Sequence, residues 1–183
     1  MTSPVSPAPP AASVPPVASA TPAAGQVTLY TTVDSPLGEL LLTGDGTALT
    51  SLSVPGQRGG ATVLPGWRRE PTAFAGAERQ LKEYFAGERR TFDLPLAPAG
   101  SDFRLRVWNA LDTVPYGATV SYRGLAEAAG SPGAVRAIGG AVGANPLLVV
   151  RPCHRVIGAD GSLTGYSGGL ERKRTLLALE GVL

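Results

Sequence analysis

The sequence predicts an α+β protein in which a small antiparallel sheet precedes a helical region. Short runs of β-branched and apolar residues, separated by turn residues, fill the stretch from residue 27 to residue 54. Apolar residues at helical spacing, several of them after capping residues, fill most of the chain beyond residue 74. With 183 residues, 43% of them hydrophobic, the chain can bury one ordinary core or two small ones.

The chain divides into a tail and two predicted domains. Residues 1–25 are almost wholly Pro, Ala, Ser, Val and Thr, without a charged side chain. Such a segment buries too little surface to offset its ordering entropy, so we expect a disordered tail. Its repeated prolines argue against a signal peptide. We expect a scaffold domain over residues 26–98 and a second domain over residues 99–183.

The first domain is expected to form a meander of three strands followed by one helix. Residues 56–71 lack apolar periodicity and predict a loop, and the apolar residues from Phe74 to Phe85 then recur near helical spacing. This half carries no cluster of residues suited to catalysis, so we interpret it as a scaffold. The three strands are predicted over residues 27–33, 39–43 and 48–54.

The second domain is predicted to contain a helix-turn-helix. Ser121 is a predicted N-cap of a short helix, Gly130 makes a turn, and Ser131-Pro132 is expected to begin the next helix with proline at its first position. Two short helices joined by a tight turn with glycine are typical of this motif. A preceding helix is predicted to start after Ser101 and to bury Phe103, Val107, Trp108 and Leu111.

The second helix of this motif has two different faces. Val135, Ile138 and Val142 fall on one stripe that we expect to be buried, which leaves Arg136 on another face. Glycine costs roughly 1 kcal/mol per interior helical position relative to alanine, so Gly139-Gly140 requires the close approach of a helix or of nucleic acid. Tight helix packing explains the glycines as well as DNA does. It does not explain a long cation on that small-residue surface.

The only cysteine, Cys153, is a candidate nucleophile. It follows Leu147–Val150, an apolar run predicted to be a buried strand or extended segment, and it precedes the only histidine, His154. A lone cysteine is more often a small buried hydrophobe, but an adjacent proton acceptor and flanking arginines favour the attacking thiolate. A single cysteine excludes an internal disulfide, and one cysteine with one histidine excludes the usual zinc clusters.

Charge is distributed unevenly along the chain. The net charge is only +2, but nine Lys and Arg stand against six Asp and Glu from Ser101 onward. A basic bias in this half fits a polyanionic partner. Charged surfaces are also normal in proteins, so the charge alone favours neither interpretation.

Motifs around the cysteine point to one family. They are Pro152-Cys153-His154-Arg155-Val156, with Gly165-Tyr166-Ser167-Gly168-Gly169 downstream and Asn145-Pro146 upstream. Together they closely resemble the O6-alkylguanine-DNA alkyltransferases, and the resemblance covers essentially everything after the tail. It implies an α+β fold with a ribonuclease H-like N-terminal domain. It extends through Asp34 to Gly38, Tyr116-Gly117, Val120-Ser121-Tyr122, Arg136 to Gly140, and Leu176 to Gly181.

The resemblance implies the chemistry of the cysteine. Cys153 would take the alkyl group from O6 of a flipped-out guanine, or from O4 of alkylthymine, and would be inactivated by the stable thioether that results. His154 would accept the thiol proton through a water while Glu180 holds the imidazole. Tyr122 would hydrogen-bond the base and help to protonate the departing guanine.

The resemblance also implies which residues bind the base. Backbone groups of Cys153 and Val156 would read its edge, and Tyr166 and Ser167 would line the pocket wall, with Ser167 donating toward O6. Asn145 would tie the end of the recognition helix to the cysteine segment.

Residues of the helix-turn-helix are implied to bind DNA in the minor groove. Arg136 would fill the stack that the extruded base vacates. Arg151 stands where an apolar residue is common in the family, and we expect it to add a phosphate contact or positive potential. The remaining implied DNA-binding residues are Ser121, Arg123, Ala134, Ala137 and Gly140.

We expect the partner to be double-stranded DNA that contains O6-alkylguanine. We expect no cofactor, no metal and no membrane partner, and a cytoplasmic monomer. A helix-turn-helix regulator that senses alkylation or oxidation at Cys153 is an alternative, and in that case a Tyr122 variant would keep its DNA response. A thiol hydrolase using Cys153 and His154 is a second alternative, and it would turn over repeatedly instead of giving one stoichiometric burst. A protein of this fold that only binds damage is disfavoured by the cysteine.

Overall fold

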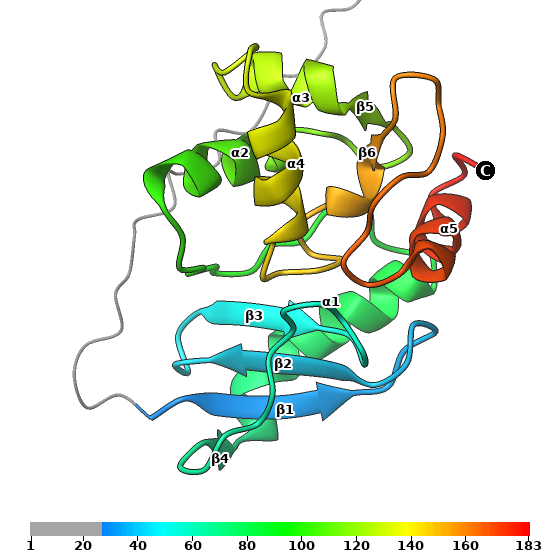
Figure 1. Cartoon of the computed structure of the whole chain (residues 1–183). Coiled ribbons are helices and arrows are strands. Elements are labelled where there is room, and N and C mark those ends of the chain that lie inside the picture. Colours follow the sequence, from blue (N-terminus) through cyan, green and yellow to red (C-terminus); the bar gives the residue numbers. More distant parts are fainter. Residues whose placement is uncertain (1–26) are drawn as a thin grey trace, which may run out of the picture.

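A computed structural model describes residues 27–183, which form a four-stranded sheet with one long helix and a helical part that contains the cysteine (Figure 1). The predicted α+β class is confirmed. The predicted tail over residues 1–25 lies outside the described residues. The sheet has the order β3-β2-β1-β4. Its strands are β1 (Leu29–Val33), β2 (Leu40–Gly44), β3 (Leu49–Ser53) and β4 (Arg68–Arg69).

The first three strands form the predicted antiparallel meander. Alternate residues of β1 are buried, as expected for a strand with one face on a core. The turn before β2 is closed by a hydrogen bond from the Gly38 N–H to the Ser35 carbonyl, and Gly38 has a φ of 100° that favours glycine. Strand β4 was not predicted, because residues 56–71 were expected to form a loop. It is only two residues long and pairs with β1 in parallel.

The outer edge of β3 is covered by two segments from elsewhere in the chain. Leu49 pairs with Leu96, and Leu52 pairs with Leu147, both in parallel. Covering an edge strand in this way removes a row of unpaired backbone groups. Residues 146–148 lead directly toward Cys153, so the sheet helps to place the cysteine segment.

Helix α1 (Ala75–Phe85) follows a short 3₁₀ turn, η1 (Pro71–Phe74), and crosses behind the sheet in Figure 1. It occurs close to where the apolar spacing predicted it. Its buried side chains include Leu81 and Tyr84, which belong to the hydrophobic core.

The helical part contains four helices and a two-stranded pair. Helices α2 (Asp102–Asp112) and α3 (Tyr122–Ala128) begin at the predicted N-caps, Ser101 and Ser121, whose side chains accept backbone N–H groups. Helix α4 (Val135–Gly143) packs against both. Helix α5 (Leu170–Leu179) closes the chain. Strands β5 (Val120–Ser121) and β6 (Val156–Ile157) pair in parallel.

The start of the recognition helix differs from the prediction. Ser131-Pro132 was expected to begin the helix, but the Ala134 N–H donates to the Ser131 carbonyl in a turn, and α4 starts at Val135. Val135 therefore lies in the first turn and is 37% exposed, so its expected burial was wrong. Ile138 and Val142 are buried as predicted.

The apolar run before the cysteine is buried but is not a strand. After the single pairing at Leu147, residues 148–150 form a turn in which Val149 has a φ of 69°. This left-handed conformation is rare for a β-branched residue and costs of order 1–3 kcal/mol. Surrounding contacts hold it, because Val149 is buried in the core.

One hydrophobic core runs through both parts of the molecule. It includes Leu40 and Leu52 of the sheet together with Trp108, Ile138 and Leu176 of the helices. The orientation of the two parts is therefore set by packing. Within residues 27–183, no helix combines the length and the hydropathy needed to cross a bilayer.

Candidate active site

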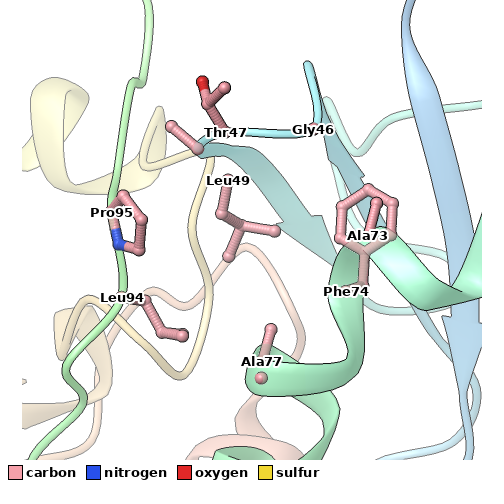
Figure 2. Close-up of a pocket in the computed structure, with 10 residues that line it drawn as sticks. Gly46, Thr47, Leu49, Ala73, Phe74, Ala77, Leu94 and Pro95 are labelled. Carbon is pink, nitrogen blue, oxygen red and sulfur yellow. The ribbon is translucent and has the colours of Figure 1, made fainter.

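A cavity of about 490 Å³ opens beside Cys153, between the helices and the sheet-containing part. A smaller cavity of about 130 Å³ lies in the sheet-containing part, and Figure 2 shows that Leu49, Phe74, Leu94 and other apolar residues line it. That cavity offers no titratable side chain. The cavity beside Cys153 is lined by Gly56, Arg58, Tyr122, Gly139, Val142, Gly143, Cys153, Gly165, Tyr166, Ser167, Gly168, Gly169 and Arg172.

Cys153 begins a short 3₁₀ turn, η2 (Cys153–Arg155), and its residue is 2% exposed. Its N–H donates to the Arg151 carbonyl over 2.8 Å, and Asn145 Nδ2 donates to its Sγ over 3.1 Å. Burial raises the pKa of the thiol to about 11, although the Asn145 hydrogen bond and the Lys173 charge oppose this rise. Burial thus outweighs the flanking cations that were expected to favour the thiolate. A proton acceptor is needed for reaction near neutral pH.

His154 is the nearest titratable base along the chain and is completely buried. Its Nε2 lies 2.9 Å from Glu180 Oε1. Burial lowers the imidazole pKa despite the opposing effect of Glu180, so the ring is neutral at pH 7. Because the carboxylate accepts at Nε2, the proton resides there, and Nδ1 keeps its lone pair. Nδ1 has no hydrogen-bond partner among the described residues.

Glu180, placed at the end of α5, receives more donors than the sequence suggested. Burial alone would raise its pKa, but hydrogen bonds from His154 and Arg155 outweigh burial, and the carboxyl pKa falls well below its usual value. Arg155 Nε and Nη2 each donate to the carboxylate over 2.8 Å. Tyr84 of α1 donates its hydroxyl over 2.7 Å. Arg155 was visible only as part of the cysteine motif, and nothing local marked Tyr84.

Tyr122, the first residue of α3, lines the same cavity as Cys153. The parallel β5–β6 pair places it there, because β5 ends at Ser121 and β6 follows the cysteine turn. The Tyr122 hydroxyl donates to the Thr164 carbonyl over 3.4 Å. Burial raises the pKa of the phenol, so it stays protonated at neutral pH and can donate a hydrogen bond or a proton.

Tyr166 and Ser167 line the same cavity as Gly139, Val142 and Gly143 of the recognition helix α4. The Tyr166 hydroxyl and Ser167 Oγ are both buried and have no hydrogen-bond partner within residues 27–183. Burial raises the Tyr166 pKa well above its ordinary value, so its hydroxyl also stays protonated. Buried polar groups are usually paired, so these two are unusual, and a ligand would reach them only once their side chains turn toward the cavity.

Asn145 lies where the sequence placed it, between the recognition helix and the cysteine segment. Its side chain accepts from the Leu147 N–H and donates toward the Leu147 and Arg151 carbonyls as well as toward the thiol. It therefore holds the backbone on both sides of the turn that precedes Cys153.

Val156 is fully buried and is not part of the cavity lining. Its N–H donates to the Cys153 carbonyl, so only its own carbonyl could still accept from a base. That carbonyl accepts from Lys173 Nζ over 2.5 Å. Lys173 is fully buried on α5 and also donates to the Thr164 carbonyl, over 2.9 Å. The sequence did not mark Lys173 as a site residue, because a lysine between Arg172 and Arg174 is typical of an exposed, charged helix face.

The outer face of α4 exposes small residues around one cation. Arg136, Ala137, Gly140 and Gly143 are exposed, and no side-chain hydrogen bond or ion pair of Arg136 occurs within the described part of the chain. A Cβ added at Gly140 or Gly143 would meet nothing within 4 Å. Packing against a neighbouring helix thus does not account for these two glycines. A Cβ added at Gly139 would instead lie 3.9 Å from the ring of Tyr122.

The other expected DNA-binding residues lie near this face or away from it. Arg123 is exposed and Ala134 is half-buried, while the Ser121 hydroxyl caps α3 by accepting from the Gly124 N–H. The expected phosphate contact of Arg151 is wrong. Its side chain is only 1% exposed and forms two 2.9 Å hydrogen bonds with Asp112, over the ring of Trp108.

Comparison with protein families gives two matches that follow one another along the chain. Residues 28–98 match the ribonuclease-like domain of 6-O-methylguanine DNA methyltransferase, and residues 102–182 match its DNA-binding domain. The described fold of a small sheet followed by a helical part agrees with these two domains.

Individual relatives agree over most of the chain. The methylated-DNA–protein-cysteine methyltransferase of Mycolicibacterium paratuberculosis is 56% identical over 154 residues, which cover 82% of this chain and 91% of the relative. The constitutive enzyme of Bacillus subtilis is 45% identical and covers 82% and 94%. The crystal structure of Mycobacterium tuberculosis OGT in complex with DNA superposes with a TM-score of 0.78 at 53% identity, covering 83% of this chain and 92% of that one. The chain therefore belongs to the 6-O-methylguanine DNA methyltransferase family.

Proposed function

We propose that this protein repairs O6-alkylguanine in double-stranded DNA by moving the alkyl group to Cys153, which inactivates the protein. One observation carries the proposal: the only cysteine lines a cavity together with the Tyr122 phenol and stands directly before the buried His154, which is paired with Glu180. A nucleobase is flat and carries polar edges, so it suits a cavity with both apolar and hydroxyl lining. The proposal extends to O4-alkylthymine, which presents an alkylated oxygen in the same way.

The transfer requires the thiol to lose a proton, because burial keeps it protonated at neutral pH. His154 is the base in this proposal: its Nδ1 lone pair is free, and a water would relay the proton from Sγ. Glu180 holds the imidazole through Nε2 and stabilises the imidazolium that forms. Arg155 and Tyr84 fix the carboxylate and so act as positioning residues.

The displacement itself forms one bond and breaks one. The sulfur attacks the alkyl carbon in line with O6, the C–O6 bond breaks, and its electron pair goes to the guanine. Tyr122 would donate a hydrogen bond or proton to the departing base, and Ser167 would donate toward O6. The product is a thioether, which has no good leaving group, so each molecule reacts once.

Base extrusion is needed because the O6 substituent of a paired guanine cannot reach a cavity in the protein. We assign the filling of the vacated stack to Arg136, on the exposed face of α4. Ala134, Ala137 and Gly140 would let the helix backbone approach the minor groove, and Arg123 would contact phosphates. The relative from Mycobacterium tuberculosis was crystallised in complex with DNA, which supports a DNA partner.

A location in the cytoplasm is part of the proposal, since the substrate is DNA and the single reactive thiol must stay reduced. The alternative hypothesis of a helix-turn-helix regulator is not favoured, because a regulator needs neither the cavity nor the Tyr122 phenol that lines it with the cysteine.

Intact mass spectrometry tests the proposal. Incubation with a duplex that contains one O6-methylguanine should add one methyl group to each protein molecule, on the peptide with Cys153, in a single burst. Cys153→Ser, which keeps the size of the side chain, should remain unmodified and should still bind the duplex. Repeated turnover, or a methyl group on any other residue, would contradict the proposal.

A further inference from the structure

The sheet-containing part, expected to be only a scaffold, contributes a cation to the cavity. Gly56 and Arg58, in the segment between β3 and β4, are part of its lining. The Arg58 N–H donates to the Ser167 carbonyl over 3.2 Å, which holds this segment against the wall of the cavity. The Arg58 side chain is exposed and makes no hydrogen bond or ion pair within residues 27–183.

A second cation on the same wall is held in place by the protein. Arg172 of α5 donates from Nε to the Leu37 carbonyl and from Nη1 to the Gly168 carbonyl, both over 2.8 Å. The cavity lining includes these two arginines and no Asp or Glu. The wall formed by the 165–169 loop and the two arginines is therefore positive, and Arg58 is the arginine whose side chain donates to no group among residues 27–183.

The position of Arg58 separates it from the surface assigned to DNA. Helices α3 and α4 carry the exposed residues assigned to DNA, and although Gly139, Val142 and Gly143 of α4 also line the cavity, Arg123 and Arg136 do not. Arg136 and Arg123 are on those helices. Unlike those two cations, Arg58 therefore borders the space that a base would enter.

We propose that Arg58 makes this protein competent for O6 adducts whose alkyl group carries a negative charge, with O6-carboxymethylguanine as the simplest example. The inference rests on the proposed function, because it assumes transfer to Cys153. The bond changes are the same: sulfur bonds to the methylene carbon, the C–O6 bond breaks, and its electron pair goes to the guanine, which takes a proton. The cysteine becomes S-carboxymethylcysteine.

Arg58 matters for such an adduct for an electrostatic reason. A carboxylate placed next to the sulfur repels the thiolate that must form, so it hinders attack. A guanidinium on the cavity wall offsets this repulsion and can bind the carboxylate through two hydrogen bonds. A methyl group has no charge and does not reach the wall. Arg58 should therefore affect anionic adducts selectively.

Single-turnover rates on three matched duplexes test the inference. They contain O6-methylguanine, O6-carboxymethylguanine, or its neutral amide analogue of nearly equal size, O6-carbamoylmethylguanine. Arg58→Gln should lower the rate on the carboxymethyl duplex about fivefold relative to the amide, the size expected for a solvent-exposed charge pair. Arg58→Glu should lower it further. Arg69→Gln is the matched control, because Arg69 is exposed in β4 and is not part of the cavity lining.

The three substrates separate the possible outcomes. An unchanged carboxymethyl-to-amide ratio in Arg58→Gln would overturn the inference. An equal loss on all three duplexes, together with weaker binding of undamaged DNA, would also overturn it and would make Arg58 a phosphate contact. If Cys153 of the wild type accepts the alkyl group from the O6-methylguanine duplex but not from the O6-carboxymethylguanine duplex, only this inference fails. If it reacts with none of the three, the proposed function fails.

Discussion

Replacement of Glu180 by Gln tests how much one buried carboxylate contributes to both stability and repair. Its two oxygens accept hydrogen bonds from His154, Arg155 and Tyr84, all between 2.7 and 2.9 Å. The carboxylate joins α1 to α5 and to the cysteine turn, and its side chain has no exposure to solvent. Glutamine keeps the shape, but it removes the charge and turns one acceptor into a donor that faces other donors.

The expected loss is large compared with the stability of a small protein. Removing one partner of a buried ion pair costs about 3–5 kcal/mol, because the other charge stays buried and unpaired. Glutamine retains one oxygen acceptor, so we expect about 3 kcal/mol, out of a typical total of about 5–15 kcal/mol. The folded-state pKa of Glu180 is lowered, so its contribution is complete above its ordinary value of 4.5 and is lost as the pH falls below it.

Urea unfolding at neutral pH and at a pH below 4.5 measures both effects. Glu180→Gln should be less stable at neutral pH and should lose less stability on acidification than the wild type. Glu171→Gln, on the exposed side of the same helix, should change stability by less than about 0.5 kcal/mol. A Glu180→Gln variant within about 1 kcal/mol of the wild type would show that the carboxylate does not hold this cluster together.

Three further predictions concern the reaction. Arg136→Ala should slow repair of duplex DNA at least about tenfold while leaving reaction with free O6-methylguanine base nearly unchanged, and equal losses in the two assays would argue against a role in base extrusion. Tyr122→Phe should reduce the transfer rate about 100-fold with little effect on binding of undamaged DNA, and weaker binding with a normal rate would exclude it as proton donor. Burial lowers the pKa of His154, so the transfer rate should stay constant down to pH 6.5 and fall only below it, as the imidazole becomes protonated. A pH–rate profile measures this, and His154→Ala should react slowly at every pH without that acid limb.

Local sequence patterns were sufficient to predict those helices and strands whose formation depends on their own residues. The run of β-branched and apolar residues over 27–33 predicted β1, and Ser101 and Ser121 marked the starts of α2 and α3. The start of α4 was not predictable in this way, because Ser131-Pro132 has the chemistry of a cap followed by a first helical residue. The chain uses it for a separate turn instead. Strand β4 exists only through its pairing with β1, which no pattern within two residues can reveal.

The residues of the candidate site fall into the same two groups, those marked by a local pattern and those placed only by the fold. Residues within one continuous motif, such as Cys153 and His154, were found from the sequence and lie in one short turn, with Cys153 lining the cavity and His154 buried behind it. Tyr84 and Glu180 are 96 residues apart, and only the tertiary fold brings them within hydrogen-bond distance. Arg58 was overlooked for a related reason, because a loop without periodicity gave no sign that it would lie against Ser167.

Arg151 provides the last prediction, since its sequence position suggested one role and its packing another. The side chain is buried against Trp108 and pairs with Asp112, whose side chain is 22% exposed. Asp112→Ala would leave a buried guanidinium unpaired, at a cost near the lower end of about 3–5 kcal/mol. The double variant Asp112→Ala with Arg151→Leu removes both charges and should regain most of that loss, because an apolar pair of similar volume is often neutral. Thermal and urea unfolding of the two single variants and the double variant measures this coupling, and strictly additive losses would mean that the ion pair does not hold the segment before Cys153.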